Sequence, residues 1–229
     1  MVRHSSKIKR VAQGHSTKSE RAEIAAIAAR LIAEGDARDF ASAKRQAAAN
    51  IGLENSRNLP DNLAVQSALL EYLRLFEGDV FDTRISLMRD EALTAMRVFN
   101  AFQPRLAGPV LYGSAVAESA VTLHLHTDEV ESVTRFLHDS RIRYQLIETR
   151  LKVAAKSYEQ FPTFLVTHNN LDFELIVLPI NSLTQPPLSA LDGRRYRRAD
   201  SVMLQQLITE AGPHDGPSRR AAIDHGAQQ

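Results

Sequence analysis

The spacing of apolar residues changes once along the chain. In roughly the first hundred residues apolar positions recur every third or fourth residue, whereas further on they recur every second residue. The helical spacing, with Ser, Asp or Asn before each start and Gly or Pro after each end, predicts helices over 19–35, 39–51, 58–78 and 82–104. Since the last two are joined by only about five residues, we expect them to pack as an antiparallel pair.

The alternating pattern begins after Pro109. It predicts a strand over 110–112, a tight turn at Gly113-Ser114 and a second strand over 120–126. A helix follows Thr127-Asp128. Further strands are predicted over 142–153, 161–167 and 172–178, and a last helix over 199–211. The sequence thus predicts an α+β fold in which a helical bundle precedes a small mixed sheet.

Four parts follow from this order of elements. We expect a flexible basic arm over residues 1–18, a helical domain over 19–104 and an α/β domain over 105–211. The polar, glycine-containing residues 212–229 are expected to form a disordered tail.

Composition narrows the class of protein. A hydrophobic content of 44% and a charged content of 24% are typical of a globular chain, and a net charge of +1 creates no overall field that would attract nucleic acid or a membrane. Cysteine does not occur in the sequence, which excludes disulfides and thiolate chemistry. No apolar run approaches the ~20 residues that span a bilayer. We therefore expect a cytoplasmic protein without a membrane partner.

The segment Val110–Leu125, VLYGSAVAESAVTLHL, resembles the signature of the nucleotidyltransferase superfamily, which has the DNA polymerase beta-like fold. In that family a strand ends in Gly-Ser, and the next strand carries two carboxylates one residue apart. Gly113 and Ser114 match the turn. Ala120 and Thr122 stand where the two carboxylates are expected.

The resemblance implies nucleotidyl transfer with two Mg²⁺ ions held by three carboxylates. Glu174 corresponds to the third carboxylate, and Asp172 lies on the same face of its strand, so these two are the catalytic candidates. One acid out of three cannot hold two Mg²⁺ ions. We therefore expect a non-catalytic or divergent relative that binds a nucleotide or a phosphorylated ligand. An active enzyme that uses Mg²⁺ is the alternative, and the cofactor stays unknown.

Two groups of residues are candidates for binding phosphate. The backbone N–H groups of Gly113 and Ser114 could approach a phosphate closely. Arginine forks match phosphate oxygens, and the run that carries them also contains Tyr196, which could stack on a base. The run comprises Arg194, Arg195, Arg197 and Arg198. A solvated run without a ligand is the competing interpretation.

The histidines of the predicted second strand suggest a different chemistry. His124 and His126 alternate with apolar residues, so they project from one face. With Asp172 or Glu174 they could bind zinc or iron, which would favour a metal-dependent hydrolase. The simpler hypothesis is that both are half-exposed, have carboxylate partners that keep them protonated to higher pH, and bind no metal.

The helical half leaves further alternatives open. Residues 19–51 could be a helix-turn-helix that binds DNA, but the joint at 35–38 lacks an apolar turn residue and the second helix has few base-reading side chains. A solvated face is favoured. A regulatory or protein-interaction module remains the third class of function.

Overall fold

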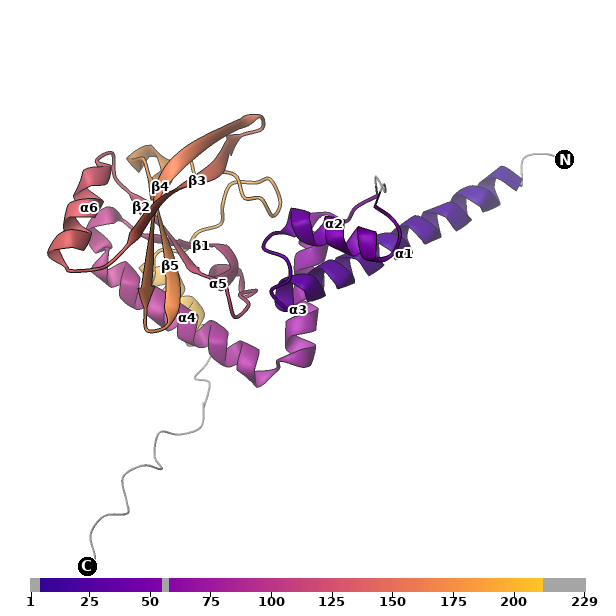
Figure 1. Ribbon diagram of the computed structural model, residues 1–229, viewed down its shortest axis with the longest axis horizontal. Coiled ribbons are helices and arrows are strands. Elements are labelled where there is room, and N and C mark those ends of the chain that lie inside the picture. Colours follow the sequence, from indigo (N-terminus) through magenta and orange to yellow (C-terminus); the bar gives the residue numbers. More distant parts are fainter. Residues whose placement is uncertain (1–4, 55–57, 212–229) are drawn as a thin grey trace, which may run out of the picture.

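The computed structural model describes residues 5–54 and 58–211, with the side chains of residues 5–17 excepted. It confirms the predicted α+β class: helices dominate the N-terminal half, and a five-stranded mixed sheet follows (Figure 1). None of the described helices is both long and apolar enough to cross a bilayer.

Three helices form a bundle beside the sheet: α1 (Ser5–Ala33), α2 (Phe40–Asn50) and α3 (Asn62–Phe76). Helix α1 packs against both others through a small core that includes Ile24, Ala28, Ala43, Ala47 and Val65. Asp39 begins α2 as predicted, because its carboxylate accepts a 2.7 Å hydrogen bond from the backbone N–H of Ser42. The predicted helix start at Ser19 is wrong, since α1 begins at Ser5. Residues 1–4 of the expected arm and the tail 212–229 lie outside the described residues.

Helix α4 (Asp79–Val98) meets α3 at an elbow and runs beneath the sheet (Figure 1). The expected antiparallel pairing of these two helices is wrong. The reason is the longer apolar stripe of α4, which packs into the main core together with the inner face of the sheet. Its buried members are Phe81, Ile85, Met88, Ala92, Leu93 and Met96. The main core therefore crosses the boundary expected at residue 104.

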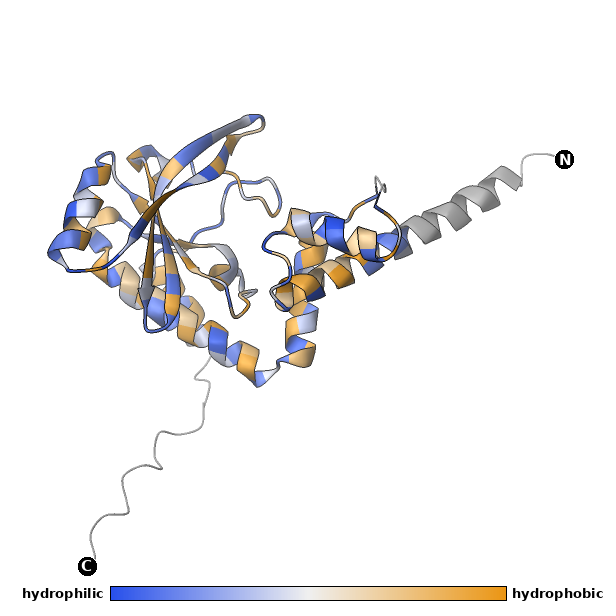
Figure 2. Cartoon of the chain, viewed as in Figure 1, coloured by the Kyte–Doolittle hydropathy of each residue, from blue (hydrophilic) through white to orange (hydrophobic). Residues whose placement is uncertain are grey.

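The sheet has the strand order β1-β2-β5-β4-β3. Its strands are β1 (Arg105–Ala107), β2 (Val121–His126), β3 (Gln145–Ala154), β4 (Ser157–His168) and β5 (Leu171–Leu178). β2 and β5 are parallel, and the other neighbours are antiparallel. Apolar and polar residues alternate along the strands (Figure 2). One face, with Val121, Leu123 and Leu125, joins the main core, so Thr122, His124 and His126 lie on the other.

The predicted strand over 110–112 is wrong, because these residues belong to helix α5 (Gly108–Tyr112). Pro109 occupies the first turn of α5, where its missing N–H costs nothing. The strand that pairs with β2 is instead β1, just before it. Gly113 ends α5 in the left-handed conformation, with a φ of 71°, and is not a hairpin turn between two strands.

The other C-terminal elements follow the predicted order. α6 (Val130–Asp139) precedes β3, and the turn between β4 and β5 places Asn169 and Asn170 at positive φ, as expected for an asparagine pair. The short helices η1 (Asn100–Phe102) and η2 (Ile180–Leu183) flank the sheet region, and α7 (Ser201–Ala211) packs against α4.

Residues 184–200, here called the connector, link η2 to α7 across the polar face of the sheet. The N–H of Leu188 donates to the carbonyl of Lys152 on β3 at 2.6 Å, and Ala199 exchanges two hydrogen bonds with Leu106 on β1. Because β3 and β1 are the two edge strands, the connector spans the sheet between them. It covers part of the face that carries His124.

Candidate functional site

Thr122 and Glu174 lie side by side on the parallel strands β2 and β5. The Thr122 hydroxyl donates to Glu174 Oε2 at 3.4 Å, and Gly108 lies so close that a Cβ there would be 3.5 Å from the Thr122 hydroxyl oxygen. Burial raises the pKa of Glu174, and the hydrogen bond from Thr122 opposes this shift. The site thus holds one partly desolvated carboxylate.

Asp172 and Glu174 line one hollow of about 680 Å³ at the start of β5, together with Glu118, Ala120 and Arg143. We call it the acidic hollow. Asp172 is exposed and accepts a 2.7 Å hydrogen bond from the Thr167 hydroxyl. Within residues 5–54 and 58–211, no three His, Cys, Asp or Glu side chains are arranged to hold a metal ion.

His126 is buried and has both ring nitrogens occupied. Its Nδ1–H donates to the Gln103 carbonyl at 2.8 Å, and its Nε2 accepts from Arg198 Nη1 at 2.9 Å, which fixes a neutral tautomer. The pKa of His126 is lowered to about 4, mainly by burial and also by the positive charges of Arg198 and Arg105, while the bond to Gln103 opposes the shift. No lone pair of this ring is left for a metal.

His124 is also buried, and neither of its ring nitrogens has a hydrogen-bond partner among the described residues. The connector residue Tyr196 packs edge-on against it, with 5.3 Å between ring centroids. Burial lowers the pKa of His124 to about 3. The expectation of half-exposed histidines that carboxylates keep protonated is therefore wrong: the connector and arginines surround them, and both rings are neutral.

Gly113 and Ser114 do not present free N–H groups. Both backbone N–H groups donate to the carbonyl of Pro109, that of Ser114 at 2.9 Å. The Ser114 hydroxyl is buried and accepts a 3.2 Å hydrogen bond from Gln66 Nε2 on α3. These residues connect α5 to the helical bundle, and no phosphate-binding turn forms here.

The arginine run separates into three environments. Arg198 points inward and hydrogen-bonds to His126 and, at 2.9 Å, to the Leu183 carbonyl. Arg194 is exposed. Arg195 and Arg197 line a cavity of about 550 Å³ between the helical bundle, the connector and α7.

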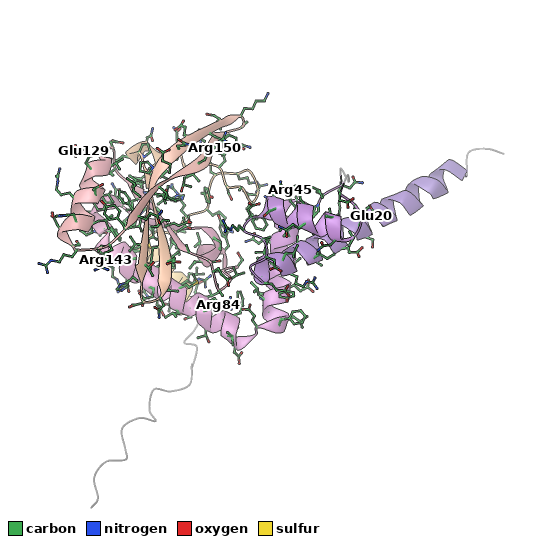
Figure 3. The ribbon with its side chains drawn as sticks, viewed as in Figure 1. Glu20, Arg45, Arg84, Glu129, Arg143 and Arg150 are labelled. Atoms are coloured by element: carbon green, nitrogen blue, oxygen red, sulfur yellow. The ribbon has the colours of Figure 1, made fainter. Side chains whose placement is uncertain are left out.

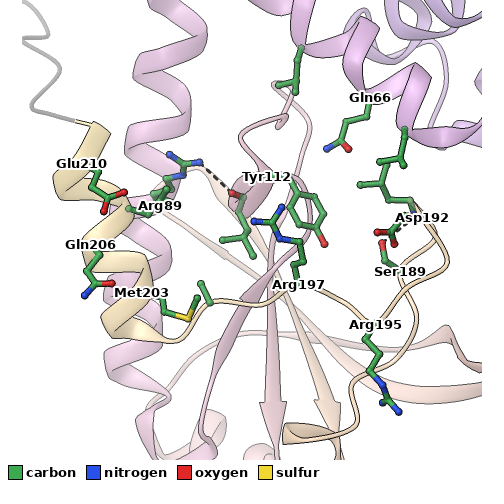
Figure 4. Close-up of a pocket in the computed structure, with 16 residues that line it drawn as sticks. Gln66, Arg89, Tyr112, Ser189, Asp192, Arg195, Arg197, Met203, Gln206 and Glu210 are labelled. Atoms are coloured by element: carbon green, nitrogen blue, oxygen red, sulfur yellow. Dashed lines mark hydrogen bonds between the residues drawn. The ribbon is translucent and has the colours of Figure 1, made fainter.

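We call this cavity the arginine cavity (Figure 4). Its polar lining consists of Gln66, Arg89, Tyr112, Ser189, Asp192, Arg195, Arg197, Gln206 and Glu210, with leucines and Met203 between them. Arg89 is held in place, because it donates to the carbonyls of Val110 and Leu111 at 3.2 and 3.3 Å. Neither Arg195 nor Arg197 forms an ion pair with a described residue. The Arg195 guanidinium donates to the Pro186 carbonyl at 3.3 Å and points away from Arg197 (Figure 4).

Tyr112 forms one wall of the arginine cavity, with the Arg197 side chain beside its ring (Figure 4). Burial raises the pKa of the Tyr112 hydroxyl, while a hydrogen bond with Ser189 opposes that shift. The sequence patterns did not identify Tyr112, Ser189 or Gln66 as residues of this cavity. Arg89 did leave a signal, since it interrupts the buried side of α4 directly after Met88.

Comparison of the chain with protein-family models, curated proteins and solved structures gave no match.

Proposed function

We propose that this protein binds a nucleotide or another phosphorylated small molecule in the arginine cavity without catalysing its transfer. The observation that carries the proposal is Arg197, which lies beside Tyr112 in a cavity of about 550 Å³ and has no ion-pair partner among the described residues, with Arg195 on the same lining. One guanidinium group can donate two parallel hydrogen bonds to a phosphate, and the cavity volume lies within the range of small-molecule sites.

The nucleotidyltransferase resemblance supports the absence of turnover. Glu174 lies beside Thr122 on a parallel neighbouring strand, which is the relation the family would give its third carboxylate. Ala120 and Thr122 supply no charge there, and burial raises the pKa of Glu174. A scaffold of this kind would bind a phosphorylated molecule and lack the acids that hold two Mg²⁺ ions.

The charge balance favours the arginine cavity over the acidic hollow. The hollow sets Glu118, Asp172 and Glu174 against Arg143 alone, so a phosphate entering it without a metal would be repelled. The arginine cavity has three arginines against the two acids Asp192 and Glu210. The electrostatic attraction for an anion is therefore stronger in the arginine cavity than in the acidic hollow.

The test is calorimetric titration with ATP, GTP and inorganic pyrophosphate, each with and without Mg²⁺, in parallel with thermal unfolding. We expect the ligand to bind without Mg²⁺. We also expect a higher Tm when the ligand is present, because a molecule that binds only the folded state stabilises that state. Arg197→Gln should weaken binding about tenfold or more, since a charged hydrogen bond contributes about 1.5–3 kcal/mol. Arg194→Gln is the matched control, because Arg194 belongs to the same run and is exposed like Arg197 but does not line the cavity.

Two results would contradict the proposal. Binding that requires Mg²⁺ and disappears in Glu174→Gln would indicate an active enzyme centred on β2 and β5. Equal losses in Arg194→Gln and Arg197→Gln would show that the cavity does not define the site.

A further inference from the structure

We propose a second ligand site, independent of the first, for a monocarboxylate with an apolar body such as a medium-chain fatty acid. It is a pocket of about 420 Å³ between α4, the loop after α6, and the end of β4 and start of β5; we call it the apolar pocket. Its lining is Glu91, Thr94, Ala95, Val98, Phe99, Arg141, Ile142, Arg143, Val166, Thr167, His168, Phe173 and Leu175.

The floor of the apolar pocket belongs to the main core. Phe99, Phe173 and Leu175 are buried, and Ile142 and Val166 pack against them. The wall continues outward to Val98, a large apolar side chain that is 49% exposed. An alkyl chain or ring placed here would remove apolar surface of ligand and protein from water, which contributes about 0.8 kcal/mol per buried CH₂.

The rim of the apolar pocket is positively charged. Arg141 and Arg143 are exposed, and their guanidinium groups form no hydrogen bond or ion pair with any residue in the described part of the chain. Figure 3 places Arg143 at the outer edge of the sheet region near α6. The acid of the rim, Glu91, already accepts a 3.0 Å hydrogen bond from Asn169 Nδ2. Apolar walls beneath two unpaired guanidinium groups are complementary to a carboxylate with an apolar tail.

The backbone at Arg141 gives a second indication. The N–H of Arg141 donates to the His138 carbonyl and that of Ile142 to the Leu137 carbonyl, which together form the Schellman motif that ends α6. Arg141 takes the left-handed position of this motif with a φ of 56°, where glycine is the favoured residue. The chain thus keeps a strained arginine at the pocket rim where glycine would fit without strain.

The experiment compares octanoate with octanamide by calorimetry at concentrations well below micelle formation. The two probes share an alkyl chain and differ in the charge of the head group. We expect octanoate to bind about tenfold more tightly, and Arg143→Gln to reduce its affinity to that of octanamide. Arg135→Gln, an exposed arginine on α6 outside the pocket lining, should leave both affinities unchanged.

Arg141→Gly separates binding from folding. Relief of the left-handed strain should leave Tm unchanged or raise it by about 2 °C, while octanoate affinity falls. Val98→Glu, at an exposed position, should fold normally and repel the carboxylate but not the amide. The proposal is overturned if neither probe binds, if both bind equally, or if Arg135→Gln has the same effect as Arg143→Gln. ATP titration of the same variants tests the arginine cavity separately.

Discussion

The polar face of the sheet and the arginine cavity contain residues of similar chemical interest, but they differ in access to solvent. His124 and His126 are buried beneath the connector and neutral, and both ring nitrogens of His126 are already hydrogen-bonded. Arg195 and Arg197 lie only a few residues from Arg198 along the connector. They line an open cavity and have no ion-pair partner among the described residues. The connector therefore buries the two histidines and leaves Arg195 and Arg197 accessible to solvent.

This contrast separates stability from binding. Substitutions on the sheet face should alter the free energy of unfolding and leave anion affinity unchanged. Substitutions in the cavity should alter anion affinity and leave the free energy of unfolding unchanged. The four predictions below test the stability side, and the last of them also compares ATP affinity.

Acidification should have the largest effect on the sheet face. The pKa values of His124 and His126 are lowered from 6.5 to about 3 and about 4. Below pH 6.5 the unfolded chain therefore binds protons at both rings that the folded chain does not bind. Stability is complete above pH 6.5 and falls as the pH drops below it. Two such groups would cost up to about 4 kcal/mol between pH 7 and 5. Urea unfolding across this range measures the slope, and a flat profile would contradict the buried neutral rings.

Replacing His126 should come next in size. His126→Leu leaves the Gln103 carbonyl without its donor and the half-buried Arg198 without its acceptor. Loss of a partner to a buried charged group costs about 3 kcal/mol. Urea unfolding at pH 7.5 measures the change, with Arg194→Gln as the control expected to stay within about 0.5 kcal/mol. A stability equal to that of the control would show that the ring is dispensable.

His124→Phe should stabilise the protein. The ring has two nitrogens that lack partners among the described residues, so an apolar ring of similar shape removes their desolvation cost and keeps the contact with Tyr196. We expect a gain of about 1 kcal/mol at pH 7 and a shallower loss of stability on acidification. A marked loss of stability at both pH values would indicate a polar partner for His124.

Glu174→Gln should have the smallest effect. Because the pKa of Glu174 is raised in the folded state, its ionised form lowers the free energy of unfolding at neutral pH. This cost is lost as the pH falls through the folded pKa. An amide keeps the hydrogen bond with Thr122 without the charge. We expect a gain below about 1 kcal/mol at pH 7 and unchanged ATP affinity. A lost affinity would transfer the ligand site to the sheet face.

Much of the fold could be read from local patterns. The shift from helical to alternating spacing gave the α+β class, Asp39 gave the start of α2, and the asparagine pair gave the turn between β4 and β5. Each depends on neighbours in the chain, through capping, periodicity or left-handed backbone conformations, and so needs no knowledge of distant contacts. The strand at 110–112 failed because a run of three apolar residues fits either a strand or one helical turn.

The site depended on contacts that no local pattern carries. The sequence alone determined that His124 and His126 share a face and that arginines cluster at 194–198. Only the tertiary structure decided that the connector crosses from β3 to β1, which buries the histidines, engages Arg198 and leaves Arg195 and Arg197 at a cavity. Burial and hydrogen-bond partners, which set protonation and access, come from segments far apart in the chain.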